Sequence, residues 1–211
     1  MQMLERSGVR KLRRKRKFLK VLKPVEVIEG DRRIGIYPAD EFRVRCYVDF
    51  PHPLVGQQQV EAVVGPETFR QLLSRARTFC FERDIVPLRS MGLIRGGSLE
   101  NAIVLTNDGV MNGPLRYPDE FGRHKALDLI GDLALAGLPL LARVEAYKAG
   151  HSLHTALVSK LLADTSSWTI ATASGDGTAS GDLIDEQGHA HSGFDGDLPV
   201  GAPHTPVTAA D

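Results

Sequence analysis

Apolar and polar residues alternate along the first third of the chain, a pattern that predicts β-strands. The alternation runs through FLKVLKPVEVIEG (residues 18–30) and resumes after the turn EGDRR in RIGIYPADEFRVRCYVDF (residues 33–50). Because successive side chains of a strand point to opposite faces, each segment would have one apolar face. The loop PHPLVGQQ and a further apolar run, QVEAVV (residues 59–64), follow. Together these segments predict a small antiparallel sheet.

The spacing of apolar residues becomes helical in three later segments. The first helix begins in GPETFRQLLSRARTFCF (residues 65–81), with Pro66 in its first turn. Its inner side would carry Leu72, Leu73 and Ala76. The second helix spans residues 119–138 and ends at AGLP, and the third is SLHTALVSKLLAD (residues 152–164).

Further strands are expected between these helices. Residues 84–112 predict a strand or short helix, a Gly-Gly break, the strand AIVLT and the turn NDG. LLARVEAYKAGH (residues 140–151) predicts a strand that leads into a glycine turn. Because strands and helices do not alternate regularly, the expected fold class is α+β.

The composition excludes several classes of protein. The 211 residues include 26 basic and 26 acidic side chains, so no net charge draws the chain to nucleic acid or to a membrane. The two cysteines, Cys46 and Cys80, are too few for the framework of a disulfide-rich secreted domain. No apolar run approaches the length, about 20 residues, that spans a bilayer, and no secretory signal is recognisable. We therefore expect a cytoplasmic protein without a membrane span.

Charge and complexity divide the chain into three parts. The run RKLRRKRK holds seven cations in eight positions, but it lacks the interleaved aromatic residues of a nucleic-acid-binding module. We therefore expect a basic leader over residues 1–17 and no nucleic-acid partner. The folded domain would cover residues 18–163. Gly, Asp, Ser, Thr and Pro dominate residues 164–211, which predicts a disordered tail. His189 and His191 of this tail could bind a metal weakly, but we expect no functional metal site there.

A polar column runs along the second predicted helix. In RHKALDLIGD, His124, Asp128 and Asp132 follow one another in steps of four residues, which places them on one helical face. A His-x-x-x-Asp pair offers one nitrogen and one oxygen ligand to a metal ion such as zinc. His151 lies at a strand-to-helix turn, where it could pair with Asp132 and support hydrolysis. The same spacing also fits ordinary salt bridges or helix caps, and the spacing alone does not decide between them.

Five segments, in order from about Lys17 to Leu162, together carry a specific resemblance. They are YVDFPHPLVGQQ, SRARTFCFERDI, GLIRGGSLENAIVL, RHKALDLIGDLALAGLPLL and AYKAGHSLHTALV. In these motifs the chain resembles the C-terminal half of the UDP-3-O-acyl-N-acetylglucosamine deacetylases, the zinc amidases of lipid A biosynthesis in Gram-negative bacteria. The resemblance implies a two-layer α/β sandwich, the second of two similar domains, with a βαβ-type insert.

The resemblance also implies roles for the residues of the polar column. His124 and Asp128 would bind zinc, or iron in its place, and Lys125 would contact substrate. Asp132 would support His151, whose imidazolium would stabilise the oxyanion or protonate the departing amine. The substrate would be UDP-3-O-acyl-N-acetylglucosamine, and hydrolysis of its N-acetyl group would give UDP-3-O-acyl-glucosamine and acetate.

The insert and the strand before it would complete substrate binding. By the same resemblance, the Thr78 hydroxyl would lie near the oxyanion and Phe79 would pack on substrate. An apolar passage would hold the acyl chain. Its lining would be Phe81, Ile85, Ile94, Ala102 and Val104. Cys80 departs from the family pattern, because a glycine usually separates the two phenylalanines, and it could narrow this corner.

Part of the family's site has no counterpart in this sequence. The third zinc ligand and the glutamate base belong to a His-Glu-His-type motif of the first domain, whereas the first histidine here is His52. The resemblance therefore leads us to expect a chain without its N-terminal domain, through a late start of the gene model, a fragment or a true truncation. The competing hypothesis is a non-catalytic module that binds the acylated nucleotide sugar or a protein partner.

Overall fold

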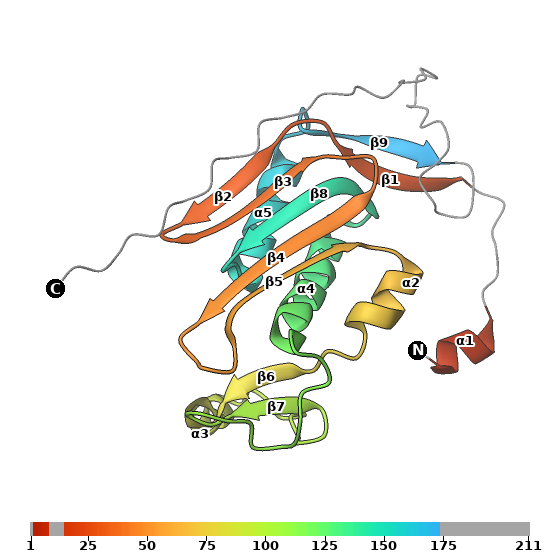
Figure 1. Cartoon of the computed structure of the whole chain (residues 1–211). Helices are drawn as coiled ribbons and strands as arrows, with labels where there is room; N and C mark the ends of the chain where they lie inside the picture. Colours follow the sequence, from red (N-terminus) through yellow and green to blue (C-terminus); the bar gives the residue numbers. More distant parts are fainter. Residues whose placement is uncertain (1, 9–14, 174–211) are drawn as a thin grey trace.

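The computed structural model describes residues 2–8 and 15–173 (Figure 1). The strands in this part are β1 (Arg16–Val21), β2 (Val25–Glu29), β3 (Arg32–Pro38), β4 (Phe42–Phe50), β5 (Gly56–Val63), β6 (Thr78–Phe81), β7 (Ala102–Leu105), β8 (Leu140–Tyr147) and β9 (Trp168–Ala173). The helices are α1 (Gln2–Ser7), α2 (Pro66–Thr68) with the π-helical turn η1 (Phe69–Leu73), α3 (Glu82–Ser90), α4 (Glu120–Leu133) with the 3-10 turn η2 (Ala134–Ala136), and α5 (His151–Ala163). Within the described part, no helix has the length and apolar character needed to cross a membrane.

Strand β8 lies at the centre of the main sheet. It pairs antiparallel with β3 and parallel with β4, and both neighbours use its residues 142–147. β2 adds to β3 and β5 adds to β4, both antiparallel, so the strands follow the order β2-β3-β8-β4-β5. The expected sheet is present, but it is mixed rather than purely antiparallel. A strand inserted between two antiparallel neighbours must run parallel to one of them.

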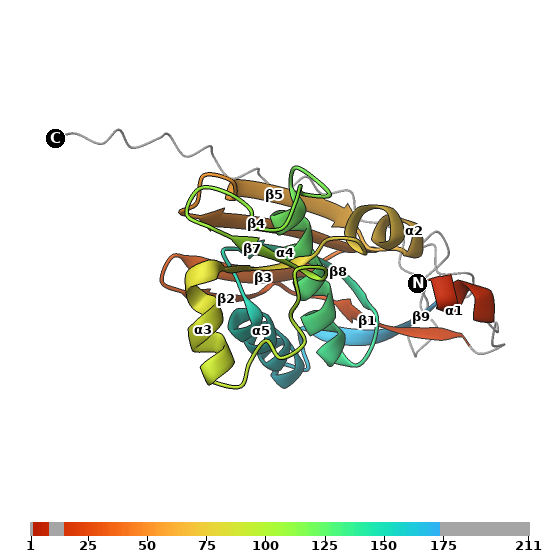
Figure 2. The same cartoon turned by 90° about the horizontal axis from the view of Figure 1, so that it is seen from below.

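Helices α4 and α5 lie side by side on one face of this sheet (Figures 1 and 2). α4 packs on β4 and β5, and α5 packs on β2 and β3. The core between the layers takes side chains from one stripe of each helix and from every second position of the strands. Buried examples are Leu129 and Leu133 of α4, Leu153, Leu157 and Leu161 of α5, and Ile36, Val44 and Val144 of the sheet. The α+β fold class is therefore confirmed.

A βαβ unit lies next to the N-terminal end of α4 (Figure 1). β6 and β7 pair in parallel, and α3 connects them along the chain. This arrangement confirms the expected βαβ-type insert. A small core, separate from the main one, joins the insert to the rest of the fold. Its buried members are Val55, Ile103, Leu105 and Phe121.

His52 fastens the insert to the loop between β4 and β5. Its Nε2 lies 2.7 Å from the Thr106 carbonyl oxygen, and the Leu54 N–H donates to its Nδ1 over 3.2 Å. We expect His52→Leu to leave the Thr106 carbonyl without this donor, at a cost of about 1–3 kcal/mol. Hydrogen exchange of the β7 amides should then become faster, while exchange in β3 serves as the internal control. Unchanged exchange in β7 would show that His52 does not hold the insert.

The first predicted helix is short and ends in a π-helical turn. Leu73 and Ala76 are buried as expected, whereas Leu72 is 40% exposed, so its placement on the inner side is wrong. The turn is closed by a hydrogen bond from the Ser74 N–H to the Phe69 carbonyl over 2.8 Å. Because this turn is wider than an α-helical one, the angular spacing of its residues changes and Leu72 faces outward.

The folded part extends beyond the boundary expected at residue 163. Strand β9 pairs antiparallel with all six residues of β1, and β1 pairs in parallel with the start of β8. The expectation of an unstructured tail is therefore wrong for residues 164–173. The physical reason is burial, because Trp168 packs against the main core and Ala171 is 4% exposed.

The N-terminal boundary shifts as well. β1 begins at Arg16, two residues before the domain start expected at residue 18, and α1 lies within the expected leader. Most of the basic run falls in residues 9–14, which lie outside the described part. The same holds for residues 174–211, which include His189 and His191.

Candidate active site

The polar column of α4 forms as the helical spacing predicts. Phe121, Leu129 and Leu133 turn into the fold, which leaves His124 and Asp128 together at the side of the helix. The Nε2 atom of His124 lies 3.3 Å from Oδ1 of Asp128, and their side chains are only 14% and 17% exposed. The two groups therefore point toward one another in a half-buried position.

Burial keeps His124 in the form that a metal requires. Its pKa is lowered first by burial and also by the neighbouring Lys125 cation, against the opposing effects of Asp128 and of the Ala76 backbone. The ring of Phe79 meets the imidazole in a T-shaped contact with 6.2 Å between the centroids. A neutral imidazole has a free lone pair, which is the ligand that divalent metals bind.

The spacing of the two groups suits a shared cation. A tetrahedral zinc ion with bonds of about 2.0–2.2 Å holds neighbouring ligand atoms about 3.3 Å apart. His124 Nε2 and Asp128 Oδ1 show this separation. The second carboxylate oxygen of Asp128 accepts a hydrogen bond from Lys125 Nζ over 2.8 Å, which fixes the carboxylate with Oδ1 on the side of His124. These residues therefore fit a metal ion as two of its ligands.

Lys125 also borders a hollow on the surface. The hollow has a volume of about 280 Å³ and lies between the start of β3, the end of β4 and the turn before α5. Its charged lining residues are Asp31, Arg32, Asp49, Lys125 and Lys148. Lys148 is held there by Asp49 at 3.1 Å and Asp31 at 3.2 Å. The opening therefore holds both signs of charge, and each of its three cations is paired with a carboxylate.

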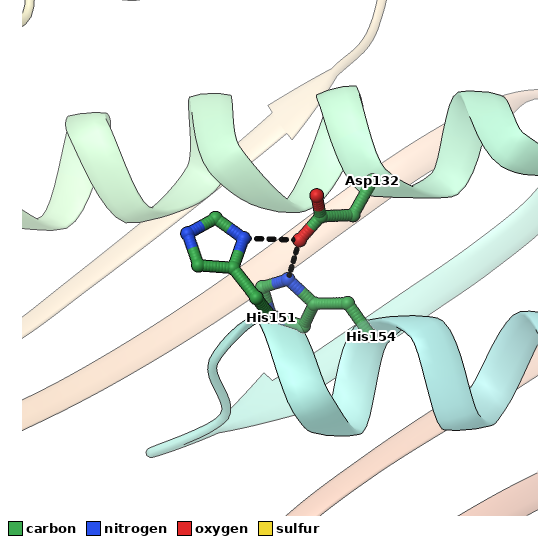
Figure 3. A group of neighbouring side chains, drawn as sticks. All are labelled: Asp132, His151 and His154. Carbon is green, nitrogen blue, oxygen red and sulfur yellow. Dashed lines mark hydrogen bonds and ion pairs between the residues drawn. The ribbon is translucent and has the colours of Figure 1, made fainter. Parts of the chain in front are cut away.

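His151 and Asp132 form a second pair next to the first. His151 is the first residue of α5, and its Nδ1 lies 2.6 Å from Oδ2 of Asp132 (Figure 3). Its Nε2 lies 3.9 Å from Oδ2 of Asp128, so the ring spans the space between the two carboxylates. The His151 side chain is 66% exposed. This arrangement can carry a proton at Nε2 beside the metal-binding pair.

A third histidine, which the sequence analysis did not select, joins this pair. His154 is fully buried, and its Nδ1 lies 2.8 Å from the same Oδ2 of Asp132 (Figure 3). Burial would raise the pKa of Asp132, but the hydrogen bonds from His154 and then His151 lower it below its ordinary value. The ligand atoms of these three side chains lie within 4.8 Å of one another. The i, i+3 spacing of the two histidines was the available signal, because such residues share a helical face.

Glu120 is a further important residue that the sequence analysis did not select. It lies at the start of α4 with no exposed surface, and it accepts hydrogen bonds from the Arg77 backbone N–H and from Nε and Nη2 of Arg77 at 2.9–3.0 Å. The Arg116 backbone N–H also donates to it, over 2.6 Å. Because Thr78 follows Arg77 directly, this clamp fixes the start of β6 relative to α4.

The residues of the insert fall on two faces. In the β6–β7 pair, Thr78 lies opposite Ala102 and Cys80 opposite Val104. Side chains alternate along a strand, so these residues share one face and Phe79 and Phe81 occupy the other. Of the residues expected to line the acyl passage, Ala102 and Val104 lie on one face of this pair and Phe81 on the other. Phe79 instead contacts Phe121 with 5.0 Å between the ring centroids.

The comparisons with known proteins agree on one family. The family model described as UDP-3-O-acyl N-acetylglycosamine deacetylase matches residues 1–163. A UDP-3-O-acyl-N-acetylglucosamine deacetylase of Solibacter usitatus is 47% identical over 172 residues, covering 81% of this chain and 58% of the relative. Proteins of the same name from Anaeromyxobacter dehalogenans and Myxococcus xanthus are each 44% identical, over 84% and 81% of this chain and 58% and 55% of their own lengths. The chain thus spans a little over half the length of these relatives.

Proposed function

Because the chain belongs to the UDP-3-O-acyl N-acetylglycosamine deacetylase family, we propose that it serves in the zinc-dependent hydrolysis of UDP-3-O-acyl-N-acetylglucosamine. The products would be UDP-3-O-acyl-glucosamine and acetate. One observation carries this proposal: the His124–Asp128 pair lies beside the His151–Asp132 pair, so two metal ligands and a proton carrier face one another. A metal ion and a positioned proton carrier each promote the cleavage of an unactivated amide.

His124 and Asp128 would hold the metal, which we propose to be zinc, with iron as the substitute. The ion would polarise the acetyl carbonyl and make bound water more acidic. Lys125 keeps Asp128 in place through its 2.8 Å hydrogen bond and, at the rim of the surface hollow, would also contact the anionic part of the substrate. Thr78, which the Glu120 clamp holds near α4, would place its hydroxyl near the developing oxyanion.

His151 would handle the proton. With Nδ1 donating to Asp132, its Nε2 would face the reacting group and either stabilise the oxyanion as an imidazolium or protonate the departing amine. We propose that the third metal ligand and the general base come from a segment that the longer relatives possess. The described residues would then form the second domain of the complete enzyme.

Metal binding tests the first step of this proposal. We expect the purified chain to bind one zinc ion weakly, because it supplies only two protein ligands. His124→Ala or Asp128→Ala should raise the Kd for zinc by at least about tenfold, since loss of even an outer-shell partner of a metal site has an effect of this size. Isothermal titration calorimetry with zinc chloride measures the number of zinc ions bound and the Kd. Asp40→Ala is the matched control, because Asp40 is an exposed carboxylate paired only with Lys20 among the described residues. Equal affinity of all four proteins would exclude the proposed site.

Activity tests the reaction itself. We expect acetate release from UDP-3-O-acyl-N-acetylglucosamine to be slow with the chain alone and fast when the chain is joined to the part of the Solibacter relative that it does not cover. The competing function, a binding module, predicts substrate binding without acetate release in both forms. That result would contradict the proposed hydrolysis.

A further inference from the structure

One carboxylate oxygen at the meeting point of α4 and α5 serves two histidines. Oδ2 of Asp132 lies 2.6 Å from Nδ1 of His151 and 2.8 Å from Nδ1 of His154 (Figure 3). An ionised carboxylate only accepts hydrogen bonds, so both contacts require a proton on the histidine nitrogen. The geometry therefore sets the same tautomer, with the proton on Nδ1, for both rings.

The two histidines differ in their surroundings. His151 is 66% exposed, whereas the side chain of His154 is 1% exposed. An ion pair between an exposed imidazole and a partly exposed carboxylate contributes little by itself, because water competes for both groups. The buried hydrogen bond from His154 has no such competition, so it is the contact that can hold the Asp132 carboxylate in one orientation.

His154 donates its hydrogen bond to Asp132 as a neutral ring. Burial lowers its pKa, against the opposing hydrogen bond to Asp132, and its Nε2 is buried with no hydrogen-bond partner among the described residues. A second proton on that nitrogen would be buried and unsatisfied, so the ring stays neutral. A lysine or arginine at this position would neutralise Asp132, whereas neutral His154 leaves the carboxylate charge available to His151.

We propose that His154 is a positioning residue, which donates from Nδ1 to Asp132 and thereby keeps His151 in the Nδ1-protonated tautomer with Nε2 facing Asp128. The meaning of this for catalysis rests on the proposed function, in which Nε2 of His151 handles the proton. The arrangement of the three side chains does not depend on it. The test of this positioning role therefore uses neither zinc nor substrate.

The imidazole nitrogens of the full chain report the tautomers directly. In long-range ¹H–¹⁵N correlation spectra of the ¹⁵N-labelled protein at alkaline pH, we expect His151 and His154 to be protonated at Nδ1. His154→Leu removes the donor but keeps the position apolar and filled, so the Nδ1-protonated form of His151 should fall from the predominant to the minor species. His154→Asn retains an N–H donor and should restore it.

A control separates this role from simple packing. Leu161→Ala opens a cavity on the same helix at a residue that is 1% exposed and belongs to the main core. It should lower the melting temperature and leave the His151 tautomer unchanged. An unchanged tautomer in His154→Leu would overturn the proposal. If that variant does not fold, the wild-type spectrum still decides, because His154 protonated at Nε2 rather than Nδ1 could not donate to Asp132.

Discussion

Replacing Glu120 with leucine is expected to lower the free energy of unfolding by about 3–5 kcal/mol. Glu120 is fully buried, and its carboxylate accepts the Arg77 guanidinium and the backbone N–H groups of Arg77 and Arg116. The substitution leaves the Arg77 side chain, 9% exposed, without its counter-charge and leaves both N–H groups without an acceptor. Urea unfolding followed by circular dichroism measures the change.

Two further variants show whether the loss arises from the buried pair. Glu67→Ala removes the exposed partner of Arg70 in a surface pair and should change stability by less than about 1 kcal/mol. The double variant Arg77→Met with Glu120→Leu should regain part of the loss, because no unpaired charge then stays buried. A loss below about 1 kcal/mol for Glu120→Leu alone would mean that the clamp is not important for stability.

The same clamp should respond to acid in a defined direction. Burial would raise the pKa of Glu120, but the hydrogen bonds from Arg77 and Arg116 lower it below the ordinary 4.5. The charged form is therefore favoured by folding, so its stabilisation is complete above pH 4.5 and is lost as the pH falls through the lowered folded-state value. The difference in stability between the native protein and Glu120→Leu should shrink over this range.

His151→Ala is expected to reduce kcat for acetate release by about 10²–10⁴-fold in the enzyme joined to the complementary part of its relative. The variant removes the group that would carry a proton at Nε2 while leaving His124 and Asp128 in place. Zinc affinity should therefore stay within a few-fold of the native value, which distinguishes loss of the proton carrier from loss of the metal. Steady-state kinetics and calorimetry give the two measurements.

A neighbouring variant controls for damage to the helix start. Ser152 follows His151 in α5 and is exposed, so Ser152→Ala should retain nearly full activity. Equal rates for His151→Ala and the native protein would contradict the role assigned to this histidine. Equal losses for both variants would instead indicate that the start of α5 tolerates no change.

The polar column of α4 could be predicted because it depends only on the period of one helix. His124 and Asp128 are four residues apart, and any α-helix brings such residues together. The pair of His151 and Asp132 needed one more assumption, that α5 begins next to α4. The position of His151 at a strand-to-helix turn suggested the pair and the resemblance to a family supported it, whereas the spacing alone also fitted salt bridges or caps.

Other features depend on partners that a local pattern does not reveal. The buried pair of Glu120 and Arg77 joins residues 43 positions apart, and each reads as an ordinary surface charge in the sequence. β9 pairs with β1, a strand about 150 residues earlier in the chain, so its partner is not visible in the local sequence. His154 lies on the apolar side of its helix, and only the position of Asp132 on a second helix gives it a polar partner.

The central place of β8 has a consequence for how the protein folds during synthesis. β3 and β4 both pair with β8, so the hairpins β2–β3 and β4–β5 stay separate until residues 140–147 leave the ribosome. During that interval each hairpin carries an open edge that can capture a strand from another nascent chain. Slow translation between residues 64 and 139 would prolong this exposure, and chaperone demand should peak there.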